Sequence, residues 1–367
     1  MLKLPYIQEF SEITSKYVQS CINAAKMDWD SYETSWDFQR HPLLRSVSRL
    51  ADAYAAWKAE CGERFQQLKK NEEELNRIFI DIYGLQDELT PEVADRDVTV
   101  HRIFDTKDDV PESMQGSNYV RAKRDEIVSL LSYAVGCIFG RYSLDVDGLA
   151  YAGGEWDAGK YKTFLPDHDD VIPITDEEYL EDDIVSGLCD WLKAVYGADT
   201  LEENLDFIAG ALGGKGNSSR EAIRSYFLKD FFKDHCKTYQ KRPIYWLFDS
   251  GKQNGFKALI YLHRYTPDTI GNLRVDYLHK MQRVYESEIN RMQDMIDHST
   301  NAREVAASTK RKEKLQKQLK ECHDYDEMIA HLALSRIKLD LDDGVKVNYE
   351  KIQTASDGKK YAVLAKI

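Results

Sequence analysis

The side chains best suited to hold a metal lie together in one acidic stretch, Asp167-His168-Asp169-Asp170. Carboxylates and an imidazole are possible ligands for a divalent cation. Their spacing matches no calcium-binding loop, so the sequence favours a solvated acidic loop over a metal site. No catalytic triad or other ligand cluster emerges, and we predict no catalytic, cofactor-binding or metal-binding residue in this chain.

A glycine-rich stretch, residues 210–219, is the one candidate for a nucleotide-binding loop. A Walker loop needs Ser or Thr directly after its lysine, whereas Lys215 is followed by Gly216. No buried strand is predicted before it, since residues 201–212 have helical spacing. The glycines therefore indicate a helix end, with Ser218 or Ser219 capping the next helix.

Charge is distributed very unevenly along the chain. The whole chain has a net charge of −13, and residues 153–206, with 16 acidic and 3 basic residues, account for all of it. Residues 215–265 hold 11 basic and 4 acidic residues, a net charge of +7. This basic region is either a phosphate-binding surface or a solvated cationic face that pairs with the acidic segment, and the sequence does not separate the two.

Seven basic residues are the candidates for contacts with DNA phosphates or base edges. Three of them fall in the first turn of a predicted buried helix that ends near Gly140, where positive charge opposes the helix dipole and indicates an acidic or phosphate partner. The other four lie in or beside a predicted β-hairpin. The seven are Arg121, Lys123, Arg124, Arg242, Lys252, Lys257 and Arg264.

Long helices must position these side chains. Apolar residues recur every three or four positions between Leu50 and Ile82, which predicts a spine helix over residues 46–83 that ends at Gly84. A helical hairpin is predicted over 273–338, a β-hairpin over 242–265, and two C-terminal strands over 339–352 and 361–367. The fold class is mainly α with small antiparallel β elements (α+β).

Composition sets the remaining expectations. No apolar run approaches the ~20 residues that span a membrane, and the first residues are not typical of a signal peptide, so we expect a cytoplasmic protein. The six cysteines are far apart, which favours buried free thiols. Trp29 and Trp36 are expected to clamp a turn before the spine, although a role in base stacking stays open.

Residues 27–44 resemble the linker that precedes the spine in PglX-like adenine-specific DNA methyltransferases of BREX phage-defence and restriction-modification systems, and four further segments carry the same resemblance. The spine end resembles the helix-end motif that follows the catalytic domain in such enzymes, and the last segment resembles their C-terminal signature. The segments are Leu75-Asn76 with Ile82-Tyr83-Gly84-Leu85, Gly140-Arg141-Tyr142-Ser143, the hairpin block 242–265, and Leu341-Asp342-Asp343-Gly344-Val345-Lys346-Val347-Asn348-Tyr349.

The catalytic motifs of these enzymes are absent from the sequence. An adenine methyltransferase holds the flipped base with an Asn/Asp-Pro-Pro-Tyr loop, and none of the eight prolines here are adjacent. The resemblance therefore implies a non-catalytic C-terminal part that recognises double-stranded DNA or acts as a spacer, with the S-adenosylmethionine-binding methyltransferase domain upstream. The alternative is a protein-interaction scaffold that docks the methyltransferase onto other phage-defence subunits.

Three segments divide these roles. We expect a helical spacer with the spine helix in residues 1–92, a mixed α/β DNA-recognition region in 93–272, and a helical hairpin followed by a β-hairpin in 273–367. We expect no cofactor in this chain, because S-adenosylmethionine is the cofactor of the catalytic domain of the parent family. We also expect no membrane partner.

Overall fold

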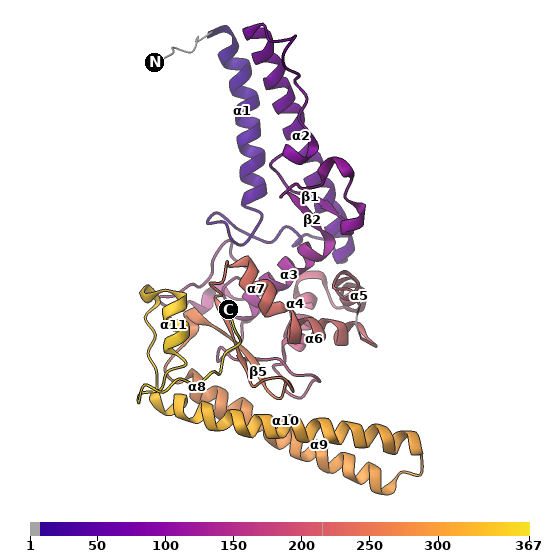
Figure 1. The fold of residues 1–367 in the computed structure, drawn as a ribbon, viewed down its shortest axis with the longest axis vertical. Coiled ribbons are helices and arrows are strands. Elements are labelled where there is room, and N and C mark those ends of the chain that lie inside the picture. Colours follow the sequence, from indigo (N-terminus) through magenta and orange to yellow (C-terminus); the bar gives the residue numbers. More distant parts are fainter. Residues whose placement is uncertain (1–7, 215) are drawn as a thin grey trace. The chain divides into compact units, whose positions relative to one another are not determined.

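The computed structural model describes residues 8–214 and 216–367, so Tyr6 and Lys215, which entered the predicted patterns, lie outside the described residues. Helices dominate and the sheets are small, which confirms the predicted α+β class. The chain forms two compact units (Figure 1). Unit 1 comprises residues up to Tyr133 with Glu202–Phe207, and unit 2 comprises Ala134–Leu201 and Ile208–Ile367.

Two long helices form the frame of unit 1 (Figure 1). Helix α1 covers Gln8–Trp29 and packs along α2, Leu50–Tyr83. The buried residues of α2 follow the predicted stripe, from Leu50 through Trp57 and Phe65. Gly84 has φ 66°, and the N–H of Leu85 donates to the carbonyl of Ile80, which closes a Schellman cap. The predicted spine helix is confirmed.

A short parallel sheet packs against the spine. Strand β1, Arg102–Phe104, pairs with β2, Val120–Ala122, and α3, Lys123–Ile138, follows directly. Arg121 therefore lies in β2, and its predicted place in the first turn of the helix is wrong. The chain is extended there because the amide of Ala122 is held by the carboxylate of Asp125, which delays the helix start to Lys123.

The predicted tryptophan clamp is wrong. Trp29 is 63% exposed and Trp36 is fully exposed. The turn between α1 and α2 is held instead by Phe38, which packs edge-on against Tyr133, and by Glu33, which accepts a hydrogen bond from Ser132 at 2.6 Å. The smaller side chains fill the space beneath the turn, and the two indoles stay on the surface.

Unit 2 is built around a three-stranded antiparallel sheet. Strand β4, Tyr245–Asp249, pairs with β5, Lys257–Tyr261, and β3, Ile172–Pro173, flanks β5. The predicted β-hairpin is therefore confirmed. Its loop, Ser250–Phe256, lies against α10, where Glu321 accepts hydrogen bonds from the amides of Gln253 and Gly255.

Four helices precede this hairpin. They are α4, Ile184–Tyr196; α5, Leu201–Ala211; α6, Ser219–Lys229; and α7, Phe231–Thr238. The glycines after α5 turn the chain as predicted, and Ser218 caps α6 by accepting from the amide of Glu221. Helix α4 begins at Ile184, and the buried carboxylate of Asp183 caps it by accepting from the amide of Val185.

The helical hairpin is also confirmed. Helix α8, Thr269–Asn272, passes through a π-helical turn at Leu273–Leu278 into α9, His279–His298, which packs antiparallel to α10, Ala302–Ser335 (Figure 1). Buried residues of both helices, among them Tyr285, Leu315 and Tyr325, join the sheet in one hydrophobic core.

The prediction of a C-terminal β-hairpin is wrong. Residues Val345–Lys351 form helix α11, because Val345, Tyr349 and Ile352 also have helical spacing and pack on the core as one face. Strand pairing is limited to isolated bridges at Thr354 with Lys360 and at Phe248 with Leu364. The sequence pattern fitted both periods, and packing selected the helix.

The predicted three-segment division rests on function and stays a prediction. No helix in the described ranges is long and apolar enough to cross a membrane. The six cysteines are free thiols, and five of them are buried.

Candidate nucleic-acid interface

Two predicted DNA contacts in unit 1 are engaged by acidic and aromatic neighbours. Arg121 donates to the buried carboxylate of Glu126, and its guanidinium lies 4.4 Å from the ring centre of Tyr32. Lys123 is 3.2 Å from Asp105, which also pairs with Lys58. Hydrogen bonds from Lys58 and Lys123 lower the pKa of Asp105 to about 2, so this carboxylate is charged at neutral pH. The charges of Arg121 and Lys123 are thus compensated inside unit 1.

Arg124 lies in the first turn of α3 and is half-buried. The sequence argument gave a choice between an acidic and a phosphate partner for this basic cluster. For Arg121 and Lys123 the structure provides the acidic partner.

Two predicted contacts in unit 2 serve to hold the fold. The ammonium of Lys257 is buried, 3.1 Å from Asp249 and 3.3 Å from the carbonyl of Leu228. Arg264 donates to the carbonyls of Phe139, Asp167 and His168 and lies over the ring of Trp156. Each side chain would have to break these bonds to reach DNA.

Arg242 and Lys252 are exposed, and within the described ranges neither forms an ion pair. They sit at opposite ends of β4, because Arg242 precedes the strand and Lys252 is in the loop that follows it. Five strand residues at about 3.3 Å each separate the two ends by roughly 16 Å. Four of the seven predicted residues are thus engaged within the fold, and Arg242 and Lys252 lie at separate ends of β4.

Arg242 belongs instead to a compact group that we name the cationic turn: Lys237, Lys241 and Arg242. Helix α7 buries Phe231, Phe232, His235 and Cys236, and this places Lys237 on its outer face. After α7 the backbone has positive φ at Gln240 (51°) and Lys241 (61°), and the amide of Lys241 donates to the carbonyl of Cys236 at 2.7 Å. Left-handed backbone at two consecutive residues with side chains is costly and is typical of functional turns.

All three side chains of the cationic turn are exposed, and no acidic group of the described residues pairs with them. Part of this arrangement suits α7 itself, because a lysine in the last turn complements the helix dipole. The dipole accounts for Lys237 but not for Lys241 and Arg242, which lie beyond the helix end. The turn is thus a local excess of positive charge, suited to a phosphate backbone.

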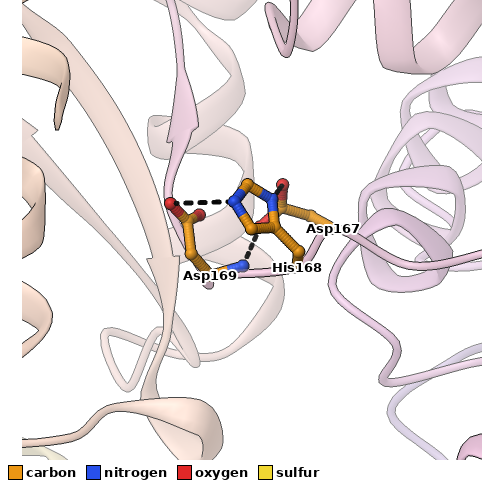
Figure 2. A group of neighbouring side chains, drawn as sticks. All are labelled: Asp167, His168 and Asp169. Carbon is orange, nitrogen blue, oxygen red and sulfur yellow. Dashed lines mark hydrogen bonds and ion pairs between the residues drawn. The ribbon is translucent and has the colours of Figure 1, made fainter.

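The acidic stretch is the second arrangement with possible chemistry. Figure 2 shows the ring of His168 between the carboxylates of Asp167 and Asp169, at 3.7 and 3.6 Å. One ligand atom from each lies within 4.8 Å of the others. Burial and the neighbouring Asp169 raise the pKa of Asp167. His168 is exposed, and exposed acidic groups commonly gather without a metal, so this geometry does not by itself identify a metal site.

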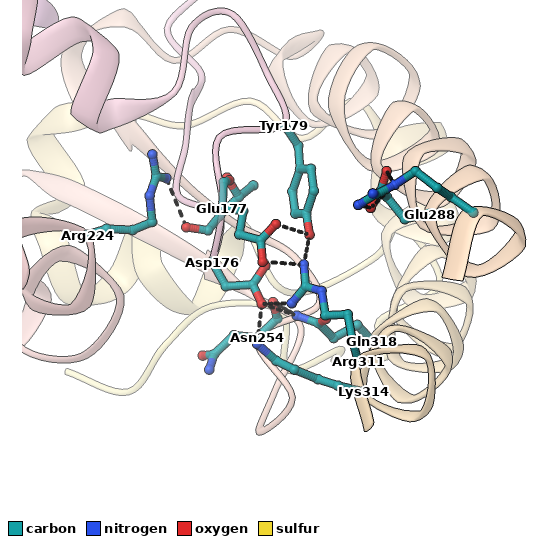
Figure 3. A network of polar contacts seen from close by, with 11 residues as sticks. Asp176, Glu177, Tyr179, Arg224, Asn254, Glu288, Arg311, Lys314 and Gln318 are labelled. Carbon is teal, nitrogen blue, oxygen red and sulfur yellow. Dashed lines mark hydrogen bonds and ion pairs between the residues drawn. The ribbon is translucent and has the colours of Figure 1, made fainter. Parts of the chain in front are cut away.

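Several acidic side chains of unit 2 form ion pairs with basic side chains of the same unit. In Figure 3, Asp176 receives Lys314 and Arg311 of α10, and Arg311 also pairs with Glu177 at 2.6 Å. Behind them Arg224 of α6 pairs with the buried Asp183 at 2.6 Å. Part of the basic region thus pairs with the acidic segment, as one of the two interpretations expected, and the cationic turn is a part that does not.

The prediction from sequence omitted Lys241. No pattern in the sequence indicates a left-handed turn at Gln240 and Lys241, since neither is glycine or asparagine. The signal available was the run of basic residues between a helix and a strand.

Comparison with known proteins gives the family. No protein-family model matches the chain. It is 45% identical over 362 residues to the adenine-specific methyltransferase PglX of Lacticaseibacillus casei (strain Zhang), covering 96% of this chain. It is 36% identical over 363 residues to the adenine-specific methyltransferase BrxX of Escherichia coli O9:H4 (strain HS), covering 94% of this chain.

The chain spans 29% and 30% of the length of these two relatives. The resemblance inferred from five short segments therefore extends over nearly the whole chain. This chain is a PglX-like sequence, homologous to a portion of the adenine-specific methyltransferases of that family.

Proposed function

We propose that this chain is the C-terminal DNA-recognition and spacer part of an S-adenosylmethionine-dependent, adenine-specific DNA methyltransferase in a BREX-type phage-defence system. The observation that supports it is the match to about three-tenths of PglX and BrxX in a sequence without a Pro-Pro-Tyr loop. In this proposal the missing part of the relatives performs methyl transfer, and this part binds the duplex that presents the adenine.

The cationic turn is the proposed point of contact with the DNA backbone. Lys and Arg side chains displace counterions from phosphates, and each neutralised phosphate contributes about −0.9 to the slope of log K against log salt. The three side chains of the cationic turn are exposed. None of them forms an ion pair with an acidic side chain of the described residues. Lys252 extends the same interface along the hairpin if the duplex follows β4.

The test is fluorescence anisotropy of the full chain with a labelled duplex over a salt series. We expect the double variant Lys241→Glu/Arg242→Glu to bind about tenfold more weakly at low salt and to lose about 2 from the salt slope. The matched control is Lys280→Glu/Arg283→Glu, which makes the same charge change at two exposed positions of α9. It should keep the wild-type slope.

Two results would contradict the proposal. One is the absence of duplex binding by the wild-type chain at low salt. The other is an equal loss in both double variants, which would assign the effect to net charge and leave the turn without a role.

A second candidate function, a docking scaffold, is favoured by exposed apolar side chains of unit 1, one methionine and two tryptophans. Met27 is 61% exposed, Trp29 63%, and Trp36 fully exposed. Exposed tryptophans are typical hot spots of protein interfaces. In this reading the aromatic surface binds the rest of the methyltransferase or another defence subunit, and DNA is met elsewhere.

Gel filtration with the unmatched portion of the Lacticaseibacillus casei PglX tests this candidate. The wild-type chain should co-elute with it, and Trp29→Ala/Trp36→Ala should elute separately. The Lys241→Glu/Arg242→Glu variant serves as the control and should still co-elute. Co-elution of the tryptophan variant, or separate elution of the wild type, would argue against docking through these residues.

A further inference from the structure

Arg141 is a buried cation in unit 2 that forms no ion pair with a carboxylate of the described residues. It stands in the segment Gly140-Arg141-Tyr142-Ser143, directly after α3, and is 9% exposed. One guanidinium nitrogen donates to the hydroxyl of Tyr261 at 3.3 Å, whereas Nε has no hydrogen-bond partner among the described atoms. A buried charge without a counter-ion is costly, so its presence requires an explanation.

The residues around Arg141 are aromatic and polar, and we name them with it the Arg141 centre. The Arg141 guanidinium lies 5.2 Å from the ring centre of Tyr142, and the hydroxyl of Tyr261 donates to the carbonyl of Tyr151 at 2.9 Å. The electrostatic neighbours of Arg141 are tyrosines, and two histidines in turn feel its charge. The members are Arg141, Tyr142, His235, Tyr239, Tyr245, Tyr261 and His263.

His235 adds a second buried donor. Its Nε2 accepts from the amides of Ile244 and Tyr245, both at 3.1 Å, so the lone pair of the neutral ring is on Nε2. Burial and the charge of Arg141 lower the pKa of His235 to about 3, which keeps the ring neutral at neutral pH. The proton must therefore be on Nδ1, and this buried N–H has no acceptor in the described structure.

His263 shows the same environment. Burial and Arg141 lower its pKa to about 4, and its Nδ1 also lacks a hydrogen-bond partner among the described atoms. Asp170 is a possible counter-ion, since its carboxylate accepts from the amide of Tyr261 at 3.0 Å. Its burial, however, raises the pKa of Asp170 well above the usual range, which favours the neutral acid. The centre therefore gathers buried polar atoms without hydrogen-bond partners around a guanidinium that forms no ion pair with a carboxylate of the described residues.

We propose that the Arg141 centre binds an oxyanion of the phosphate class, which pairs with the Arg141 guanidinium and accepts from the buried donors beside it. Planar guanidinium and phosphate match in geometry, and such pairs are strong in a low-dielectric interior. A buried donor without an acceptor marks a missing water or ion. The unsatisfied Nδ1–H of His235 and the unsatisfied Nε–H of the Arg141 cation together favour the ion.

A glycine lies next to one member of the centre, His263. Gly153 and Gly154 have φ 106° and 83°, and a Cβ on Gly153 would lie 3.9 Å from the ring of His263. Tyr151 and His263 are half-exposed and lie next to this loop. Tyr239 belongs to the turn that also carries Lys241 and Arg242. The oxyanion is therefore either free phosphate or a backbone phosphate of DNA.

Thermal unfolding of the full chain in inorganic phosphate tests the proposal, with sodium chloride of equal ionic strength as reference. We expect a rise in melting temperature of about 2 to 4 °C that saturates at millimolar phosphate, because a ligand of the folded state stabilises by mass action. General exclusion of phosphate from protein surfaces grows with concentration instead of saturating. Arg141→Gln should abolish the saturating part, while its melting temperature in chloride should equal or exceed that of the wild type.

Arg224→Gln is the matched control, because Arg224 is an equally buried arginine of unit 2 but is paired with Asp183. It should melt lower in chloride and keep the phosphate response. A wild type without a saturating response, or an Arg141→Gln variant that retains it, would overturn the proposal. If Arg141→Gln does not fold, Arg141→Lys replaces it. Its response should need more phosphate, and an unchanged response would equally overturn the proposal.

Duplex binding separates the two sources. If DNA supplies the phosphate, millimolar phosphate should compete with duplex for the wild type, and Arg141→Gln should both weaken duplex binding and remove the competition. If free phosphate is the ligand, duplex affinity should be the same in wild type and Arg141→Gln. Either result supports an oxyanion site, since both require the saturating thermal response.

Discussion

Unit 2 contains two groups of cations that differ in how their charge is balanced. In the network of Figure 3, Arg311 and Lys314 of α10 pair with Asp176. Nearby in the same unit, Arg224 pairs with the buried Asp183. In the Arg141 centre the guanidinium meets tyrosine side chains, and its Nε has no partner in the described structure. Both groups are within one compact unit, so the difference is not one of exposure alone.

The difference separates charges that hold the fold from charges available to a ligand. A buried cation with a carboxylate and further hydrogen bonds has completed its interactions, and removing it leaves the carboxylate unpaired. A buried cation that has no carboxylate partner can still form an ion pair with an anionic ligand. The same distinction applies at the surface, where Lys123 is paired with Asp105 while Lys241 and Arg242 have no acidic partner among the described residues.

The largest effect is expected at the paired buried arginine. Arg224→Gln leaves Asp183 buried without its counter-ion, so the free energy of unfolding should fall by about 3 kcal/mol. Urea unfolding followed by far-UV circular dichroism measures this loss. A loss as large from Arg141→Gln under the same conditions would remove the contrast between the two arginines.

Acid should destabilise the Arg141 centre through His235. The pKa of this ring is lowered to about 3 in the folded chain, so between its usual value of 6.5 and about 3 only the unfolded chain takes up the proton. Stability must therefore fall as pH decreases through this window, by up to about 1.4 kcal/mol per pH unit. His235→Gln should show a slope shallower by this amount in urea unfolding between pH 4 and 6. An unchanged slope would mean that His235 is not held neutral by the fold.

The smallest effect is expected at a paired surface cation. Lys123→Gln removes one ion pair to Asp105, which keeps Lys58 as its partner, so stability should change by about 1 kcal/mol or less. Its duplex affinity and salt slope should match those of the wild type. If Lys123→Gln reduced the salt slope by about 1, the pairing seen here would not prevent DNA contact, and unit 1 would join the interface.

The sequence predicted elements that depend on local periodicity and turn chemistry. The spine followed from apolar residues three and four apart, and its end from Gly84, because only local backbone geometry is involved. The hairpin of β4 and β5 followed from two β-prone runs around an Asn-Gly loop. Helix α11 was missed because its apolar positions fit a strand as well as a helix, and only packing against the core decides between them.

The candidate site was less predictable, because a basic side chain is identified by type but not by what neutralises it. Arg264 bonds to carbonyls about a hundred positions earlier in the chain, and Arg311 pairs with a carboxylate even farther away in sequence. The backbone at Gln240 and Lys241 is left-handed although neither residue is glycine, so the turn could not be predicted from residue type. Four of the seven predicted residues, Arg121, Lys123, Lys257 and Arg264, are engaged within the fold. The first three pair with carboxylates only 5, 18 and 8 residues away in sequence, and the residue types alone do not show that these pairs form.

The sequence by itself determined the fold class, the spine helix with its glycine cap, both confirmed hairpins and the PglX-like family, since each is set by residue types over short distances. The tertiary structure alone decided which cations are neutralised within the fold, because charge compensation depends on side-chain distances and burial, which residue types do not give. It also revealed Arg141 as a buried charge whose neighbours are tyrosines and histidines. A positive charge becomes available to a ligand only when folding brings it no acidic partner.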